Sequence, residues 1–128
     1  MSEKQKNISL ENFWKMRFDA LKKTLISNNF KVYIAQDSSE VKDIFYKEII
    51  NQIKPRSISW GGSMTFISTG LYHELKDSTE YEVLDTYDKS ISKEEMVERR
   101  RQSLLVDLYI TSTNAITEDG QLVNLDMI

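Results

Sequence analysis

One stretch of the chain combines residue types that are suited to binding a small anion. Residues 57–65 read Ser-Ile-Ser-Trp-Gly-Gly-Ser-Met-Thr, so a short β-type run meets two glycines, a hydroxyl side chain and an amphipathic pattern. Glycines let a backbone turn tightly and approach a ligand closely, and the first amides of a helix favour an anion. The candidate ligand-binding residues in this stretch are Gly61, Gly62, Ser63, Met64 and Thr65.

The spacing of this stretch fits a second interpretation equally well. Two glycines before a helix can simply make a tight turn between strand and helix. The stretch lacks the lysine of a Walker loop and the three-glycine spacing of a dinucleotide-binding loop. From the residues alone, the anion site and the tight turn therefore have equal weight.

A second polar segment lies near the end of the sequence, where acidic and amide side chains crowd into thirteen positions. Glu118 could act as a general base or nucleophile, and Asp126 could supply a second carboxylate. Asn, Asp and Gly are also the residues that hairpin turns need, and from the residues alone turn chemistry is favoured. The candidate residues of this segment are Asn114, Glu118, Asp119, Gly120, Asn124 and Asp126.

Two further features could carry charge chemistry. The run Arg99 to Arg101 could clamp a phosphate or carboxylate through paired hydrogen bonds. A solvated helix face, paired with nearby glutamates such as Glu94, Glu95 and Glu98, is the favoured interpretation of that run. The single histidine, His73, falls on or beside an apolar helix face, where a packing or surface role is favoured over catalysis.

The composition excludes several classes of protein. The 128 residues suffice for one domain, and 40% hydrophobic with 29% charged residues is ordinary for a globular protein. A net charge of −3 argues against a nucleic-acid or membrane partner. Without cysteine and with one histidine, the chain offers no disulfide, no metal site and no iron–sulfur cluster of its own, so no cofactor is expected. The polar N-terminus lacks a signal-peptide core, which predicts a cytoplasmic location.

Hydrophobic periodicity predicts alternating helices and strands. Helices are expected at about 8–28, from Asp37 or Ser38 to the turn at Pro55, at 63–76, and from Ser92 to about 104. Strands are expected at 30–35, 57–60, 81–84 and 104–110, and a hairpin at 115–124. This alternation predicts a single α/β domain over 1–128 with a mostly parallel sheet. The two glycine-containing segments are expected to meet and form the site.

Several separated blocks of the sequence resemble one family. The blocks SISWGGSMTFISTGLYHEL and DTYDKSISKEEMVERRRQSLLVDLYITSTNAITEDGQLVNLD are similar to the LUD-domain family, the lactate-utilisation protein C-like proteins, and the resemblance runs from about Ile8 to the end. It implies the superfold of sugar-phosphate isomerases, CoA transferases and translation-initiation-factor-2B-like proteins, with a three-layer α/β/α sheet and a ligand cleft at the strand C-termini. It also implies that residues 61–65 and residues 114–126 are the two motifs of that cleft.

The resemblance suggests a function and two alternatives. Family members are associated with the oxidation of L-lactate to pyruvate beside iron–sulfur partner proteins, which predicts a component or accessory of L-lactate utilisation that binds a small carboxylate or phosphate. The chain stops before the family domain does, so a truncated domain and a homo-oligomer that covers its open sheet are expected. A noncatalytic module that docks a partner by strand addition, or an isomerase- or transferase-like enzyme, are the alternatives.

Overall fold

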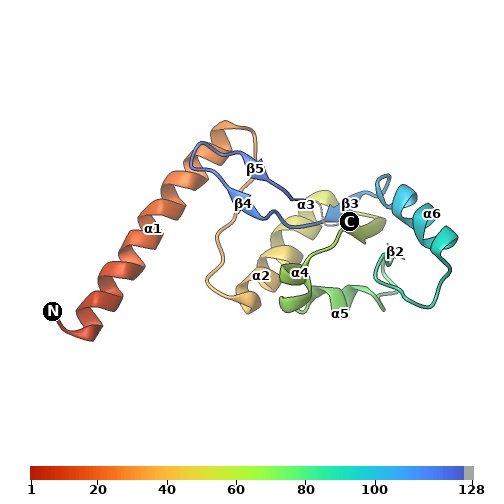
Figure 1. Ribbon diagram of the computed structural model, residues 1–128, viewed down its shortest axis with the longest axis horizontal. Helices are drawn as coiled ribbons and strands as arrows, with labels where there is room; N and C mark the ends of the chain where they lie inside the picture. Colours follow the sequence, from red (N-terminus) through yellow and green to blue (C-terminus); the bar gives the residue numbers. More distant parts are fainter. Residues whose placement is uncertain (126–128) are drawn as a thin grey trace. The chain divides into compact units, whose positions relative to one another are not determined.

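The computed structural model describes residues 1–125 and divides the chain into two compact units (Figure 1). The first unit is formed by Met1–Ile34 with the segment from Thr113 onward. The second unit is the continuous segment Ala35–Ser112. No helix in the described part of the chain is long and apolar enough to cross a membrane.

The second unit is built on a parallel sheet of three strands. These are β1 (Ser57–Trp60), β2 (Glu82–Leu84) and β3 (Leu108–Ile110), in the order β2-β1-β3. The central strand β1 is parallel to both neighbours, and Ile58 lies opposite Val83 on one side and Leu108 on the other. Parallel strands separated by helices confirm the predicted α/β class.

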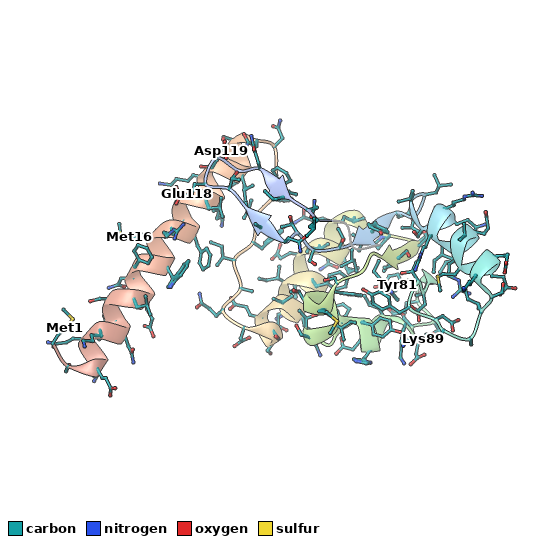
Figure 2. The ribbon with its side chains drawn as sticks, in the orientation of Figure 1. Met1, Met16, Tyr81, Lys89, Glu118 and Asp119 are labelled. Carbon is teal, nitrogen blue, oxygen red and sulfur yellow. The ribbon has the colours of Figure 1, made fainter. Side chains whose placement is uncertain are left out.

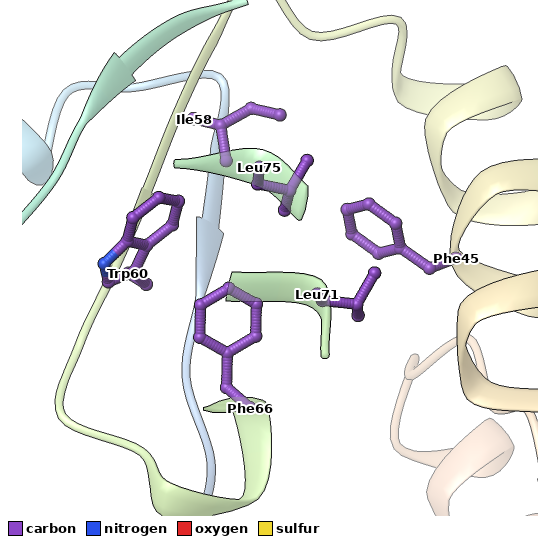
Figure 3. Packing of buried hydrophobic residues seen from close by; sticks show 6 residues of the cluster. All are labelled: Phe45, Ile58, Trp60, Phe66, Leu71 and Leu75. Carbon is purple, nitrogen blue, oxygen red and sulfur yellow. The ribbon is translucent and has the colours of Figure 1, made fainter. Parts of the chain in front are cut away.

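One face of this sheet carries the hydrophobic core. Ile58 and Trp60 are fully buried, and because they are two residues apart in a strand they share a face. Figure 3 shows them packed with side chains from the helices. Each such buried side chain contributes roughly 1.5–3 kcal/mol. The helical residues of the cluster are Phe45, Phe66, Leu71 and Leu75.

The helices of this layer come from both sides of β1 in the sequence. Before β1, α2 (Ser38–Ile44) continues into a π-helical segment, η1 (Phe45–Ile50), and then α3 (Asn51–Ile53). Of the two predicted caps, Asp37 and Ser38, it is Asp37 that caps α2, by accepting a hydrogen bond from the amide of Glu40 at 2.9 Å. The helical run ends at Lys54, which adopts a left-handed conformation immediately before Pro55.

The other face of the sheet is covered by α6 (Lys93–Ser103). Ser59 lies between Ile58 and Trp60, so it points to this opposite face, and it is fully buried. Its hydroxyl donates to the carbonyl of Leu84 at 2.7 Å, which joins β1 to β2 through a side chain. Ser92 caps α6 as predicted, accepting from the amide of Glu95 at 3.1 Å. Helices on both faces give the predicted three layers.

Three sequence-based expectations are wrong. Residues 30–35 do not form a strand, because no described strand pairs with them and β-propensity alone is not enough. The helix expected at 63–76 is two short helices, α4 (Met64–Ser68) and α5 (Leu71–Leu75), separated by Gly70 at φ 81°. The strand expected at 104–110 begins only at Leu108, since Leu104 and Leu105 form the turn after α6 and are 72% and 86% exposed.

The first unit consists of one long helix and a hairpin. The helix α1 (Glu3–Ser27) begins five residues earlier than predicted, because Ser2 and Gln5 form a reciprocal capping box. The hairpin strands β4 (Ala115–Ile116) and β5 (Leu122–Val123) are antiparallel, which confirms the predicted hairpin. Its Gly120 lies against Asn28, Thr24 and Leu25 of the helix end.

The break between α4 and α5 predicts a specific cost for Gly70→Ala. A left-handed conformation disfavours a side chain by roughly 1–2 kcal/mol, and an added Cβ would lie 2.9 Å from Cε of Lys42. Urea unfolding should show a loss of stability of about that size. The matched control is Gly62→Ala, because Gly62 is not left-handed and an added Cβ meets nothing within 4 Å. Equal losses in the two variants would contradict this account.

Candidate functional site

The carboxyl ends of three parallel strands lie at one edge of the sheet in the second unit. Three loops leave this edge: residues 61–63 after β1, residues 85–88 after β2, and residues 111–112 after β3. In open α/β sheets ligands bind outside the carboxyl ends of the strands. The glycine stretch therefore lies at the edge where a ligand site is expected.

The two glycines of this stretch have different surroundings. Gly61 extends the pairing of β1 with β3, because its amide donates to the carbonyl of Ile110 at 2.9 Å. A Cβ at Gly61 would lie 2.7 Å from the hydroxyl of Tyr109 and 3.1 Å from that of Thr111. Gly62 is exposed, and a Cβ there would meet nothing within 4 Å. Packing accounts for Gly61 but not for Gly62.

Two amides at the start of α4, those of Ser63 and Phe66, are already hydrogen-bonded within the protein. The buried hydroxyl of Ser63 accepts from the amide of Phe66 at 3.0 Å and so caps α4. The amide of Ser63 donates to the hydroxyl of Tyr87 at 2.9 Å. The helix α4 has only five residues, so its dipole is small. Within the described residues, the amides of Gly62, Met64 and Thr65 have no hydrogen-bond partner.

The side chains of Met64 and Thr65 are both exposed. Met64 is 79% exposed, whereas Phe66 in the same helix is buried. Thr65 lies at the second position of α4. Gly62, on the other side of Ser63, is exposed as well. The accessible donors of the glycine loop are therefore those of residues 62, 64 and 65.

Tyr87 from the neighbouring loop holds the glycine loop in shape. Its hydroxyl donates to the carbonyl of Gly61 at 2.5 Å while it accepts from the amide of Ser63. The hydroxyl therefore bridges the two ends of the Gly61–Ser63 turn. Burial raises the pKa of Tyr87, although the hydrogen bond from Ser63 acts in the opposite direction.

Asp85 organises the loop that carries Tyr87. Its carboxylate accepts from the amide of Tyr87 at 2.8 Å, from Nε1 of Trp60 at 3.3 Å and from the hydroxyl of Tyr72 at 3.2 Å. Thr86 adds a hydrogen bond from its hydroxyl to the carbonyl of Trp60 at 2.7 Å. The sequence showed this segment only as a polar loop, because all but one of these partners are distant in the sequence. The run Asp-Thr-Tyr-Asp after a strand was its one signal.

Arg99 and Arg101 of the arginine run have different partners. Arg99 is part-buried and attaches α6 to the same loop, by donating to the carbonyl of Asp85 at 2.8 Å and to the carboxylate of Asp88 at 3.2 Å. Hydrogen bonds from Ser90 and from Arg99 hold the pKa of Asp88 below its usual range. Arg101 pairs with Glu98 at 3.7 Å, as expected for a solvated helix face. His73 is exposed, with its ring against Tyr72.

The second predicted motif belongs to the first unit, where it forms the hairpin. The Asn114 side chain accepts a hydrogen bond from the amide of Leu125 at 2.8 Å. The backbone carbonyl of Asp119 accepts one from the side-chain amide of Asn28 at 3.2 Å. Gly120 is buried at φ 84°, a conformation that the turn requires. Asn124 is exposed, and Asp126 lies outside the described residues. That the two motifs meet in one cleft stays a prediction.

Glu118, the predicted catalytic carboxylate, lies at the tip of the hairpin. Its side chain is 87% exposed and pairs with Arg17 of α1 at 2.9 Å. Both partners are in the first unit. In the described part of the chain, no three His, Cys, Asp or Glu side chains are grouped so that they could hold a metal ion.

The sheet and the loops at its carboxyl edge define a class of protein. It is an α/β protein with a parallel sheet, whose carboxyl edge carries an open glycine loop braced by a Tyr-Asp loop. The model of the LUD domain family matches residues 18–128, and the chain belongs to this family. The chain has no significant match among curated proteins or among solved structures.

The bridge made by Tyr87 predicts a local effect of Tyr87→Phe. The variant keeps the ring against Trp60 and Tyr72 but removes both hydrogen bonds, at about 0.5–1.5 kcal/mol each. Hydrogen exchange at the amide of Ser63 should become faster. Tyr109→Phe is the matched control, since within the described residues the hydroxyl of Tyr109 makes no hydrogen bond. Unchanged exchange at Ser63 would contradict the bridge.

The raised pKa values of Tyr72 and Tyr87 predict a loss of stability at high pH. Burial is the main cause in both. Because the folded state holds these protons more tightly, their contribution is complete below the unfolded value of about 10 and falls as pH rises through the folded value. The difference in unfolding free energy between the wild type and Tyr87→Phe should therefore shrink above that pH. A constant difference, measured by urea unfolding, would exclude a buried phenol.

Proposed function

We propose that the protein is a component or accessory of L-lactate utilisation, and that it binds a small carboxylate or phosphate at its glycine loop. Membership of the LUD domain family supports the first part. The single observation that carries the second part is Gly62. It is exposed, has open space beside it and is not in a left-handed conformation, so neither packing nor backbone strain accounts for a glycine there.

The donors around Gly62 support an anionic ligand. The amides of residues 62, 64 and 65 have no partner within the described residues, and an anion would satisfy them. Hydrogen bonds to a charged group contribute about 1.5–3 kcal/mol each. Tyr87 keeps the turn curved, because its hydroxyl holds Gly61 and Ser63 together. The ligand would therefore bind to a loop whose shape is set in advance.

The negative charges near this edge are largely compensated within the protein. Asp85 accepts three hydrogen bonds, two of them from the side chains of Trp60 and Tyr72. Asp88 accepts from Ser90 at 2.9 Å and pairs with Arg99. An anion at the glycine loop would therefore meet carboxylates that are already paired. This pattern supports binding of a small acid in spite of the acidic composition of the chain.

We propose a binding role rather than a reaction for the site. Glu118, the one carboxylate considered as a catalytic base, is mostly exposed and paired with Arg17. Redox chemistry would belong to an iron–sulfur partner protein, because this chain has no cysteine to hold a cluster.

The function is tested by ligand titration monitored at the backbone. L-lactate, pyruvate, inorganic phosphate and a CoA thioester would be added separately to ¹⁵N-labelled protein. The amide resonances of Gly62, Met64 and Thr65 should shift with at least one of them. No shift at these amides with any of the four would overturn the ligand site.

A methyl group at Gly62 should weaken this binding without unfolding the protein. Gly62→Ala places its Cβ in the open space that the ligand would use. We expect a dissociation constant at least about tenfold higher, equivalent to roughly 1.4 kcal/mol, with an unchanged midpoint of urea unfolding. Ser68→Ala, at an exposed position at the far end of the following helix α4, is the control and should bind as the wild type does. Equal affinity of Gly62→Ala and the wild type would contradict the proposal.

A further inference from the structure

Two hydroxyl side chains at the end of β3 lie beside the glycine loop. In the register of the sheet, Ser59 of β1 lies opposite Tyr109 of β3. Side chains alternate along a strand, so Tyr109 and Thr111 point to the same face of the sheet as Ser59 and Gly61, away from the core. Both side chains therefore reach Gly61 from the face of the sheet that α6 covers elsewhere.

The hydroxyls of Tyr109 and Thr111 converge on one point. A Cβ placed on Gly61 would lie 2.7 Å from Oη of Tyr109 and 3.1 Å from Oγ1 of Thr111. The two oxygens are therefore no more than about 5.8 Å apart, which is the sum of these two distances. They form a pair of hydroxyls at the carboxyl edge of the sheet, where the glycine loop begins.

Both hydroxyls of this pair are free within the part of the chain that the structure describes. The neighbouring Tyr87 hydroxyl is used as donor and as acceptor, because it bonds to Gly61 and Ser63. The hydroxyls of Tyr109 and Thr111 make no hydrogen bond to a described residue, and both side chains are exposed, that of Tyr109 by 41%. Packing of the Tyr109 ring explains the glycine at position 61, but a phenylalanine ring would pack equally well. The packing therefore gives no reason for the phenol oxygen.

The hydroxyl pair is close enough to the open amide of Gly62 for one small molecule to reach both. From the Cβ position at Gly61, a C–C bond of about 1.5 Å leads to Cα, and roughly 2.4 Å more leads to the next nitrogen. The amide nitrogen of Gly62 therefore lies within about 6.6 Å of the Tyr109 oxygen. A ligand with two oxygens about 3 Å apart, and a hydrogen bond of about 2.8–2.9 Å at each end, can span that distance.

The chemistry of this edge favours an acid with a second oxygen on the carbon next to its carboxylate. A hydroxyl can donate and accept, so the pair can satisfy an alcohol in both directions, and either member can donate to a keto oxygen. The three loops of the edge, residues 61–63, 85–88 and 111–112, contain no lysine or arginine but include Asp85 and Asp88. Phosphate sites characteristically use those cations. A singly charged carboxylate therefore fits this edge better than a phosphate.

We propose that Tyr109 and Thr111 are specificity-determining residues, which bind the α-oxygen of a 2-hydroxy or 2-oxo acid whose carboxylate lies on the amide of Gly62. The inference rests on the proposed function, because it takes the glycine loop as the carboxylate site. It adds the class of ligand and the two residues that distinguish it from other acids. An acid without an α-oxygen leaves both hydroxyls without a partner in the complex and therefore binds more weakly.

The assignment is tested by comparing L-lactate with propionate, which differs from it only in lacking the hydroxyl group. Each acid is titrated into the ¹⁵N-labelled full chain and followed at the amide of Gly62. The wild type should bind L-lactate about tenfold more tightly than propionate, the size of effect that one hydrogen bond can supply. In Tyr109→Phe this preference should fall to about threefold or less. Thr111→Val removes the other hydroxyl at nearly the same volume and should lower the preference in the same way.

Tyr81→Phe is the matched control for the loss of a phenol hydroxyl. Tyr81, labelled in Figure 2, immediately precedes β2 and therefore lies at the amino edge of the same sheet, opposite to the glycine loop. This variant should keep the full preference for L-lactate. Circular dichroism establishes that each variant is folded, and Thr111→Val carries the test if Tyr109→Phe is not.

The possible failures of this inference and of the proposed function give different results. If the wild type binds L-lactate and propionate equally well at Gly62, or if both hydroxyl variants keep the preference, the glycine loop remains a ligand site but the inference is overturned. Tighter binding of inorganic phosphate than of L-lactate would overturn it in the same way. If none of these ligands shifts the amide of Gly62, the proposed ligand site fails, and the inference fails with it.

Discussion

The burial of Trp60 at the carboxyl end of β1 links the core of the second unit to its candidate site. Its ring packs 5.3 Å from the ring of Phe66 and 5.4 Å from that of Tyr72, in the layer between sheet and helices. A buried indole needs a partner for its N–H, and that partner is Asp85 in the loop after β2. The backbone carbonyl of Trp60 accepts a hydrogen bond from the Thr86 hydroxyl. The residue that ends the central strand therefore fixes the neighbouring loop through both its side chain and its backbone.

From this loop the constraint passes to the glycine turn. Asp85 accepts the amide of Tyr87, and the Tyr87 hydroxyl then bridges Gly61 and Ser63. The carboxylate of Asp85 is half-buried beside aromatic rings, and its three donors satisfy it there. The packing of the core therefore fixes the shape of the glycine turn. A ligand that binds it would not have to order it.

Local signals were sufficient for part of this structure. The strand at Ser57–Trp60, the caps at Asp37 and Ser92 and the hairpin around Gly120 were predicted because each depends on residues close in the sequence. The missing strand at 30–35 and the late start of β3 depend on pairing partners, which periodicity does not contain. The break at Gly70 was missed because the apolar spacing continues through it. The network of Asp85 and Tyr87 was missed for the same reason as the strands, since its partners are mostly some 25 residues away.

The two glycines of the loop have different structural roles, although they are adjacent in the sequence. As a sequence, Gly61-Gly62 supported an anion site and a tight turn with equal weight. The structure assigns a packing reason to Gly61, where the hydroxyls of Tyr109 and Thr111 approach the backbone, and none to Gly62. The amide of Ser63 is already bound to Tyr87, so the amides of Gly62, Met64 and Thr65 are the ones left for a ligand. The turn interpretation therefore holds for the first half of the motif, and the ligand interpretation rests on the second half alone.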